Sequence, residues 1–269
     1  MALTTFLDRR GHWHDNAATQ QTALAAAQRL DDLTAQALTH HSLARASTML
    51  GSHQDARAHY GQALELYRRL GDHAGQGRAH VGLSEVCDRL GRYDEALAHN
   101  MQALDLHRAA GDRTWEAAAL NNVGWFHAQL GDYRQALAYC EQAVALNREL
   151  GNRNGEAHIW DSIGYVRHRL GQYPEAIACY QRALALPREL GDRFFQAEVL
   201  IRLGDSHDAD GQPRAAGEAW QQALDILDDL QHPRADEIRT RLRPEAATGG
   251  ARPAGGTGEA SGSPRDAGR

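Results

Sequence analysis

The chain has 269 residues and a formal net charge of -6 at pH 7, and all 29 of its basic residues are arginines. Without lysine, a Walker-type phosphate lysine and a Schiff-base or amine nucleophile are excluded. The excess of acidic residues disfavours direct binding to nucleic acid, which needs a basic surface.

Apolar-Gly pairs recur every 20 residues along most of the chain. The pairs are Leu50-Gly51, Leu70-Gly71, Leu90-Gly91, Ala110-Gly111, Leu130-Gly131, Leu150-Gly151, Leu170-Gly171 and Leu190-Gly191. Glycine after an apolar run is typical of a helix end, so two pairs per 40 residues predict two helices per repeat. Because so small a repeat cannot bury its own apolar face, neighbouring repeats must stack into a solenoid.

The repeats divide the chain into four parts. In chain order these are a half-repeat cap (1–30), five helix pairs (31–230), a C-terminal capping segment (231–243) and a disordered tail (244–269). The tail is predicted to be disordered because it has no large apolar residue. Pro187 predicts a bend or an early end in the second helix of the fourth pair. With no signal-peptide pattern at the start and no apolar segment of membrane-spanning length, we expect no membrane partner and a cytoplasmic protein.

The third repeat illustrates the expected helix pair. Asp112 is a suitable N-cap, and apolar residues at helical spacing after it predict a first helix over about residues 113–130. A second amphipathic pattern begins at Tyr133 and ends at Leu150-Gly151. The repeat is therefore expected to be an antiparallel helix pair.

Residues 40 positions apart form columns of similar character. The first helices carry an apolar column (Leu43, Leu83, Val123, Ile163, Leu203) followed by a small-residue column (Ala44, Ser84, Gly124, Gly164, Gly204). The second helices carry two alanine columns (Ala56, Ala96, Ala136, Ala176, Ala216 and Ala63, Ala103, Ala143, Ala183, Ala223) around a larger residue (Tyr60, Asn100, Cys140, Tyr180, Trp220). Small residues beside large ones favour close helix packing.

These columns resemble the tetratricopeptide repeat over residues 31–230. HEAT-type solenoids have a similar period, but the glycine after the apolar column and the two alanine columns fit them poorly. The resemblance implies an all-α, right-handed superhelical solenoid of antiparallel helix pairs, with a period of 40 residues instead of the usual 34 or so.

Three short segments are similar to the C-terminal repeat region of bacterial transcription regulators of the AfsR/SARP type. They are residues 6–13 (FLDRRGHW), 121–125 (NNVGW) and 161–165 (DSIGY). In that family the region follows a DNA-binding domain and an NB-ARC nucleotide-binding switch, and neither is found in this sequence. The resemblance implies a regulatory or sensor module, either a fragment of a longer regulator or a separate gene product, and transfers no DNA or nucleotide chemistry to any residue.

Metal binding is not expected. The best local clusters are His12 with His14 and the His40-His41 pair, but these side chains are expected on different helical faces or in separate repeats. The three cysteines lack Cys-x-x-Cys spacing and are interpreted as packing residues.

Catalysis and cofactor binding are not expected either. Gly75 and Gly77 have the wrong spacing for a dinucleotide loop and follow no predicted strand, so we interpret them as loose glycines in a first helical turn. No nucleophile elbow can be argued from the spacing of serine, histidine and acidic residues. The sequence therefore predicts no enzyme and no cofactor.

In tetratricopeptide arrays that bind peptides, the first helices line the concave face. By resemblance, the residues on that face are His41, Arg45, Arg78, Val81, Glu85, Asn121, Trp125, His158, Asp161, Tyr165, Arg169, Ile201 and Asp205. In one interpretation Trp125 and Tyr165 anchor an apolar ligand side chain while Asn121 and Asp161 bind its backbone. In the other, both aromatics only pack between helices, and the sequence favours neither. The set lacks the recurring Lys and Asn of the two-carboxylate clamp, which disfavours chaperone tails as ligands.

The sequence thus predicts a module that binds a protein or peptide noncovalently on its concave face. The leading hypothesis is the regulatory part of an AfsR/SARP-like transcription regulator, with an NB-ARC/DNA-binding regulator as one candidate partner. The alternative is a free-standing adaptor that assembles other proteins, and an enzyme is a distant third. The sequence identifies neither the partner nor the oligomeric state.

Overall fold

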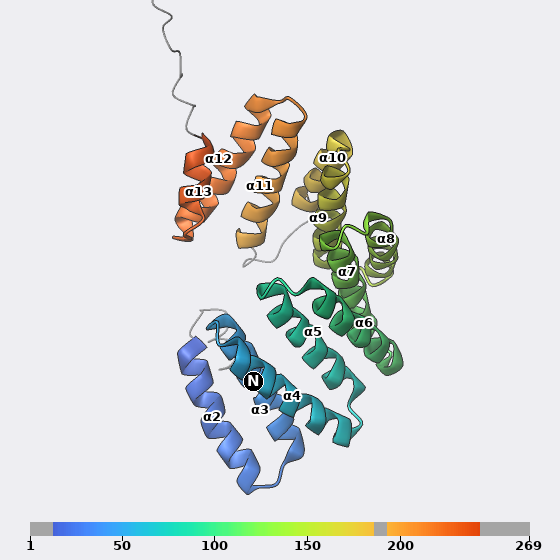
Figure 1. The fold of residues 1–269 in the computed structure, drawn as a ribbon, viewed down its shortest axis with the longest axis vertical. Coiled ribbons are helices and arrows are strands. Elements are labelled where there is room, and N and C mark those ends of the chain that lie inside the picture. The colour runs from blue at the N-terminus through green and yellow to red at the C-terminus, as the bar shows by residue number, and fades with distance from the viewer. Residues whose placement is uncertain (1–12, 186–192, 243–269) are drawn as a thin grey trace, which may run out of the picture.

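The computed structural model describes residues 13–185 and 193–242, and every regular element in these two ranges is a helix. The helices are α2 (Trp13–Arg29), α3 (Leu33–Met49), α4 (His53–Leu70), α5 (His73–Arg89), α6 (Tyr93–Ala110), α7 (Arg113–Gln129), α8 (Tyr133–Glu149), α9 (Arg153–Arg169), α10 (Tyr173–Ala185), α11 (Arg193–Ala209), α12 (Pro213–Asp229) and α13 (Ala235–Leu242). They stack along one long axis, from α2 at one end to α12 and α13 at the other (Figure 1). The predicted solenoid of antiparallel helix pairs is confirmed. The bend at Pro187 and the tail at 244–269 lie outside the described residues.

Glycines at the expected stops have left-handed backbone conformations. Gly71 and Gly111, for example, both have φ of 67° as C-caps, a region that costs glycine no steric strain. Asp31 and Gln231 take the corresponding positions at the first and last described turns, with φ of 52° and 51°. The 20-residue rhythm of helix ends thus continues where the glycine is missing.

Polar side chains cap the beginnings of four first helices. Each accepts a hydrogen bond from the backbone N–H three residues later, which satisfies one of the free donors at a helix start. The capping residues are Asp32, Asp72, Asp112 and Asn152. The predicted cap at Asp112 is confirmed, with 3.2 Å between its Oδ1 and the Trp115 nitrogen.

The columns found in the sequence form the core. Every residue of the two alanine columns is completely buried, and the apolar column of the first helices is buried as well. A Cβ added to Gly164 would lie 2.7 Å from the Tyr180 ring, and one added to Gly204 would lie 2.4 Å from the Trp220 ring. The small residues are therefore required for the close approach of the two helices in a pair.

Gly75 and Gly77 correct one interpretation of the sequence. Both lie buried within α5, where an added Cβ would come 2.4 Å from Tyr67 and 2.7 Å from His107. Gly75 does lie in the first turn of α5, where its N–H donates to the capping residue Asp72. Neither glycine is loose, however, because both are close-packing positions between α5 and its neighbours.

The first helices of successive pairs form an inner layer. Contacts join α3 to α5, α7 to α9 and α9 to α11, while α4, α6, α8 and α10 pack against the first helix on either side of them. Direct contact between first helices shortens the stack on their side, so the solenoid curves toward them. The face formed by α7, α9 and α11 carries the candidate site.

Candidate functional site

Three adjoining hollows follow the inner face across α7, α9 and α11 to α13. Their volumes are about 370, 240 and 280 Å³ in that order. The first and second share Asn121, Asn122 and His158, and the second and third share Glu198 and Arg202. We call this continuous depression the inner groove.

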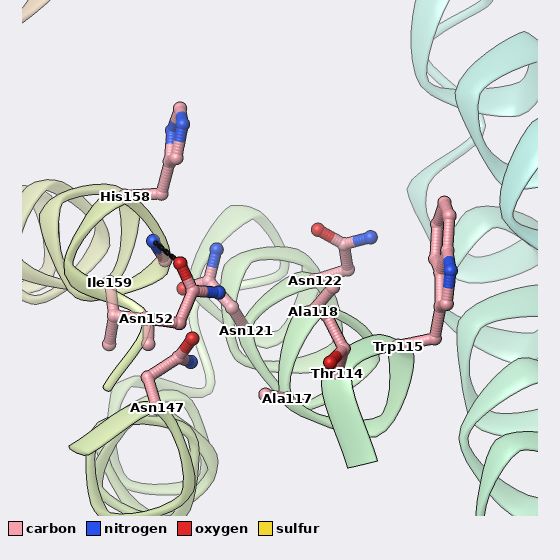
Figure 2. Close-up of a pocket in the computed structure, with 11 residues that line it drawn as sticks. Thr114, Trp115, Ala117, Ala118, Asn121, Asn122, Asn147, Asn152, His158 and Ile159 are labelled. Carbon is pink, nitrogen blue, oxygen red and sulfur yellow. Dashed lines mark hydrogen bonds between the residues drawn. The ribbon is translucent and has the colours of Figure 1, made fainter. Parts of the chain in front are cut away.

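The first hollow is lined by asparagines that α7, α8 and the turn before α9 supply (Figure 2). Asn152 Oδ1 accepts a hydrogen bond of 3.0 Å from the Gly155 N–H, and Asn147 Nδ2 donates one of 2.9 Å to the Ala143 carbonyl. Asn147 Oδ1 and Asn121 Oδ1 are both buried without a hydrogen-bond partner in the described part of the chain. Buried carbonyl oxygens are nearly always paired, so these two atoms are unsatisfied acceptors beside the hollow.

Gly155 makes this arrangement of asparagines possible. A Cβ at Gly155 would lie 2.0 Å from Asn147 Oδ1 and 2.7 Å from Asn152 Nδ2. Any side chain at this position would therefore displace both amides, so the position favours glycine. At the rim, the His158 ring lies against Phe195 of α11, with 4.0 Å between the ring centroids.

Two aromatic residues form the middle of the groove. The rings of Trp125 and Tyr165 contact each other, with centroids 5.0 Å apart and planes inclined by 46°. Arg202 lies over the Trp125 ring at 5.5 Å, and Arg169 donates a hydrogen bond of 2.9 Å to the Tyr165 hydroxyl. Trp125 lines the second hollow and Tyr165 the third, and both are half-buried. The pair is thus packed between helices and accessible from the groove, so both interpretations drawn from the sequence describe part of its environment.

A buried ion pair lies beside the aromatic pair. Arg202 Nη1 donates to Asp161 Oδ2 at 2.5 Å, and the Asp161 side chain is only 7% exposed. Burial raises the pKa of the Asp161 carboxyl, and the Arg202 guanidinium opposes this rise. Asp161 Oδ1 has no hydrogen-bond partner within the described residues, so it is a third unsatisfied acceptor.

Two further ion pairs close the groove at α13. Arg234 binds Glu198, and Arg241 Nη1 donates to Asp205 Oδ1 at 2.5 Å. Trp220 Nε1 also donates to Asp205 Oδ1, at 3.1 Å. Burial raises the pKa of the Asp205 carboxyl, and Arg241 opposes this rise. The groove therefore offers neutralised carboxylates and directed hydrogen bonds, with little net charge.

Eight of the thirteen residues expected on the concave face line the groove. They are Asn121, Trp125, His158, Asp161, Tyr165, Arg169, Ile201 and Asp205.

The other five lie on α3 and α5 and line none of these three hollows. His41 is edge-on to Tyr60, and burial lowers its pKa to about 4. Arg45 lies over the Trp13 ring at 5.8 Å, and Glu85 pairs with Arg89 at 2.9 Å. Arg78 lies 3.9 Å from Asp72, and Val81 is half-buried.

The sequence interpretation missed several groove residues. Glu198 is 40 positions after His158, so extending that column would have identified it. Arg202 follows Ile201 directly but lies in none of the columns used. Asn147 and Asn152 lie outside the first-helix columns, at the end of α8 and in the following turn. Arg241, in α13, is 40 positions after Ile201, so extending the column of His41, Val81, Asn121, Asp161 and Ile201 by one repeat would have indicated it.

The two histidine clusters that the sequence analysis considered for metal binding are not seen together in the structure. His12 lies outside the described residues, and His40 and His41 contact different partners, His59 and Tyr60. Among the described residues, no group of three or more metal-binding side chains converges. The three cysteines are buried and free, and burial raises the pKa of the Cys140 thiol to about 12, as expected of a packing residue. No described helix is long and apolar enough to cross a bilayer.

Comparisons with known proteins agree with this architecture. The tetratricopeptide repeat family model matches residues 36–109, 75–149, 115–189 and 155–229, whereas no curated protein matches the chain significantly. Among solved structures, the chain is similar to BtubC (BKLC) from P. vanneervenii, at 21% identity and a TM-score of 0.64 over 94% of this chain and 99% of that one.

Two Rap structures are similar as well. A Rap protein complexed with Competence and Sporulation Factor has 17% identity and a TM-score of 0.65, over 89% of this chain and 71% of that one. The Rap conjugation gene regulator of plasmid pLS20, in complex with the Phr* peptide, has 14% identity and a TM-score of 0.66, over 78% of this chain and 57% of that one. At such identities the likeness concerns the fold alone. Since the family model covers more than half of the sequence, the chain belongs to the tetratricopeptide repeat family.

Proposed function

We propose that the chain binds an extended peptide segment noncovalently in the inner groove over α7, α9, α11 and α13. The observation that carries the proposal is the combination of three buried, unpaired oxygens with an accessible aromatic pair. The oxygens are Asn121 Oδ1, Asn147 Oδ1 and Asp161 Oδ1. Unpaired acceptors cost free energy in the free protein, and peptide N–H groups would satisfy them.

The aromatic pair suits an apolar side chain of the ligand. Trp125 and Tyr165 line adjacent hollows, and such residues dominate the free energy of many interfaces. Arg169 and Arg202 hold the two rings in place. We therefore assign backbone recognition to the asparagine hollow and Asp161, and side-chain recognition to the aromatic pair.

The structural neighbours support a peptide ligand. One of the similar Rap structures is a complex with a peptide, so this solenoid fold is compatible with such a ligand. The remaining residues of the expected concave face, on α3 and α5, would contact only a ligand that extends beyond the three hollows. Noncovalent binding also accords with the absence of a catalytic pattern in the sequence.

The regulatory context is a further part of this proposal. It rests on the resemblance of residues 121–125 and 161–165 to AfsR/SARP-type regulators. In that setting ligand binding would bias a switch domain, whereas a free-standing adaptor would assemble other proteins. A neighbouring reading frame that encodes a DNA-binding domain and an NB-ARC domain would favour the regulator, and its absence the adaptor.

The double substitution Trp125→Ala with Tyr165→Ala tests the site. Peptides are first selected on the full chain from a random display library, and their affinities are measured by isothermal titration calorimetry. We expect the double variant to lose about 2 to 4 kcal/mol of binding free energy, the range for aromatic hot spots. Circular dichroism should show an unchanged helical fold.

Tyr139→Ala is the matched control. Tyr139 is also half-buried and also packs against another ring, that of His127 at 5.4 Å, but it lines none of the three hollows. Its replacement should leave peptide affinity unchanged. Equal affinities for the parent and the double variant, or equal losses in the double variant and the control, would refute the site.

A further inference from the structure

Two pairs of histidines join the helices of the first two full repeats. His40 Nδ1 of α3 lies 3.0 Å from His59 Nδ1 of α4, and His80 Nδ1 of α5 lies 3.1 Å from His99 Nδ1 of α6. The ring centroids are 5.2 and 5.3 Å apart and the interplanar angles are 39° and 37°. The same geometry thus occurs twice, 40 residues apart, and neither pair belongs to the inner groove.

All four imidazoles are neutral at pH 7. Burial lowers the pKa of each of them. The pKa of His80 falls to about 4, mainly through burial and to a smaller extent through the neighbouring His99. Asp55 opposes the fall in the pKa of His59, and Glu95 opposes it for His99, whereas Arg57 adds to it for His99. A neutral imidazole keeps a nitrogen lone pair, the form in which histidine binds a metal ion.

The separation of the two nitrogens matches that of a chelating pair. Metal–imidazole bonds are about 2.0–2.1 Å long, so two nitrogens at 90 to 109° around one ion lie about 2.9–3.4 Å apart. Both nitrogen–nitrogen distances, 3.0 and 3.1 Å, fall within this range. In each pair one ring now donates its Nδ1–H to the other. When an ion enters, that proton moves through solvent to Nε2 of the same ring, so both rings stay neutral and no net proton is released.

We propose that His40 with His59, and His80 with His99, are two chelating sites for divalent transition-metal ions of the Zn²⁺, Ni²⁺ and Cu²⁺ class. Imidazole is a suitable ligand for all three ions. No third metal-binding side chain converges with either pair in the described part of the chain, so water completes the coordination and the ions are exchangeable. Each ion links the two helices of one repeat, at positions that are only partly buried and open to solvent.

The sites go beyond the proposed peptide binding and are independent of it. They lie on α3 to α6, whereas the inner groove is built from α7 onward. Nor did the sequence indicate them, because the partners are 19 residues apart and belong to two different helices. The sequence suggested His41 as the neighbour of His40, whereas the structure pairs His40 with His59.

Copper titration of the full chain, without an affinity tag and in a non-coordinating buffer at pH 7.5, tests the proposal. Electron paramagnetic resonance should detect two Cu²⁺ ions per chain, each coupled to two imidazole nitrogens. His59→Gln and His99→Gln should each reduce the number of bound ions from two to one, and the double variant should bind neither. Zn²⁺ should raise the unfolding temperature of the parent and not that of the double variant.

His73→Gln is the matched control, because His73 is exposed at the start of α5 and belongs to neither pair. It should bind two ions, as the parent does. Spectra of the parent with a single coupled nitrogen, or undiminished binding in the double variant, would overturn the proposal. The nitrogen count is measured on the parent itself, so it decides the question even if a variant fails to fold.

Discussion

Replacing Arg202 by alanine should destabilise the fold in a pH-dependent way. Arg202 is the only ion-pair partner of Asp161 among the described residues. The Asp161 side chain is 7% exposed, and its Oδ1 already lacks a hydrogen-bond partner in the described structure. The substitution therefore leaves a buried carboxylate without its compensating cation.

The size of the effect follows from this burial. Removing one partner of a buried pair costs about 3 to 5 kcal/mol, because the remaining charge stays desolvated. Burial already raises the pKa of Asp161 against the influence of Arg202, and in the variant the main group that opposes this rise is gone, with only the smaller influence of His158 left. A carboxyl whose folded pKa exceeds its unfolded value favours folding while it is protonated, and the penalty grows as pH rises toward the folded pKa. With an unfolded pKa near 3.9, the penalty at pH 5 is limited to about 1.5 kcal/mol.

Thermal unfolding followed by circular dichroism at pH 7 and pH 5 measures this difference. We expect a fall in melting temperature of roughly 10 °C at pH 7 and a much smaller one at pH 5. Histidines remote from Asp161 affect both proteins alike and cancel in the comparison.

Arg113→Ala serves as a control, because Arg113 pairs with Glu149 across α7 and α8 at 2.7 Å and both side chains are more than half exposed. It should cost less than about 1 kcal/mol. The combined change Asp161→Asn with Arg202→Met should recover most of the stability, since no buried charge remains. If Arg202→Ala unfolds like Arg113→Ala at both pH values, Asp161 is solvated and the reasoning fails.

Two further predictions concern stability. Gly82→Ala places a Cβ 2.1 Å from the ring of Tyr60, which is 1% exposed, and should cost about 1 to 3 kcal/mol by overpacking. Gly61→Ala is the control, because no atom lies within 4 Å of the new Cβ. It should be neutral or stabilise the fold by up to about 1 kcal/mol. Equal denaturation midpoints for the two variants would refute the packing argument. Burial lowers the pKa of His41 and of His80 to about 4, so the unfolded chain binds protons first. Melting temperature should therefore fall as pH decreases from about 6.5 to 4, and a constant value would contradict this.

The fold could be predicted from the sequence because each repeat packs its two helices together in the same way. Ala136 and Gly164 are small since a neighbouring helix lies against them, and the same demand recurs every 40 residues. Helix ends were equally predictable, because glycine and the capping residue Asp112 act through local backbone geometry. At Asp31 and Gln231 the same turn occurs without glycine, where the sequence carries no such signal.

The site could be predicted only in part. Columns of the first helices located Asn121, Trp125 and Tyr165 on one face, because that face also repeats. The columns did not indicate that His41 packs edge-on against Tyr60. That contact depends on how deeply the His41 side chain is buried, which the spacing of residues does not show. Nor did the columns indicate Asn147 and Asn152, which lie outside the first helices and reach the groove only through tertiary structure.

Hydrogen exchange measured by mass spectrometry tests the central claim most directly. The full chain is compared with and without a library-selected peptide at saturating concentration. Peptide binding in the inner groove should slow amide exchange in α7, α9, α11 and α13, because the occupied groove stabilises these helices against local opening. The same measurement on the Trp125→Ala, Tyr165→Ala variant should show no slowing. Protection confined to α4, α6 and α8, or to α3 and α5, would contradict the inner groove as the binding site.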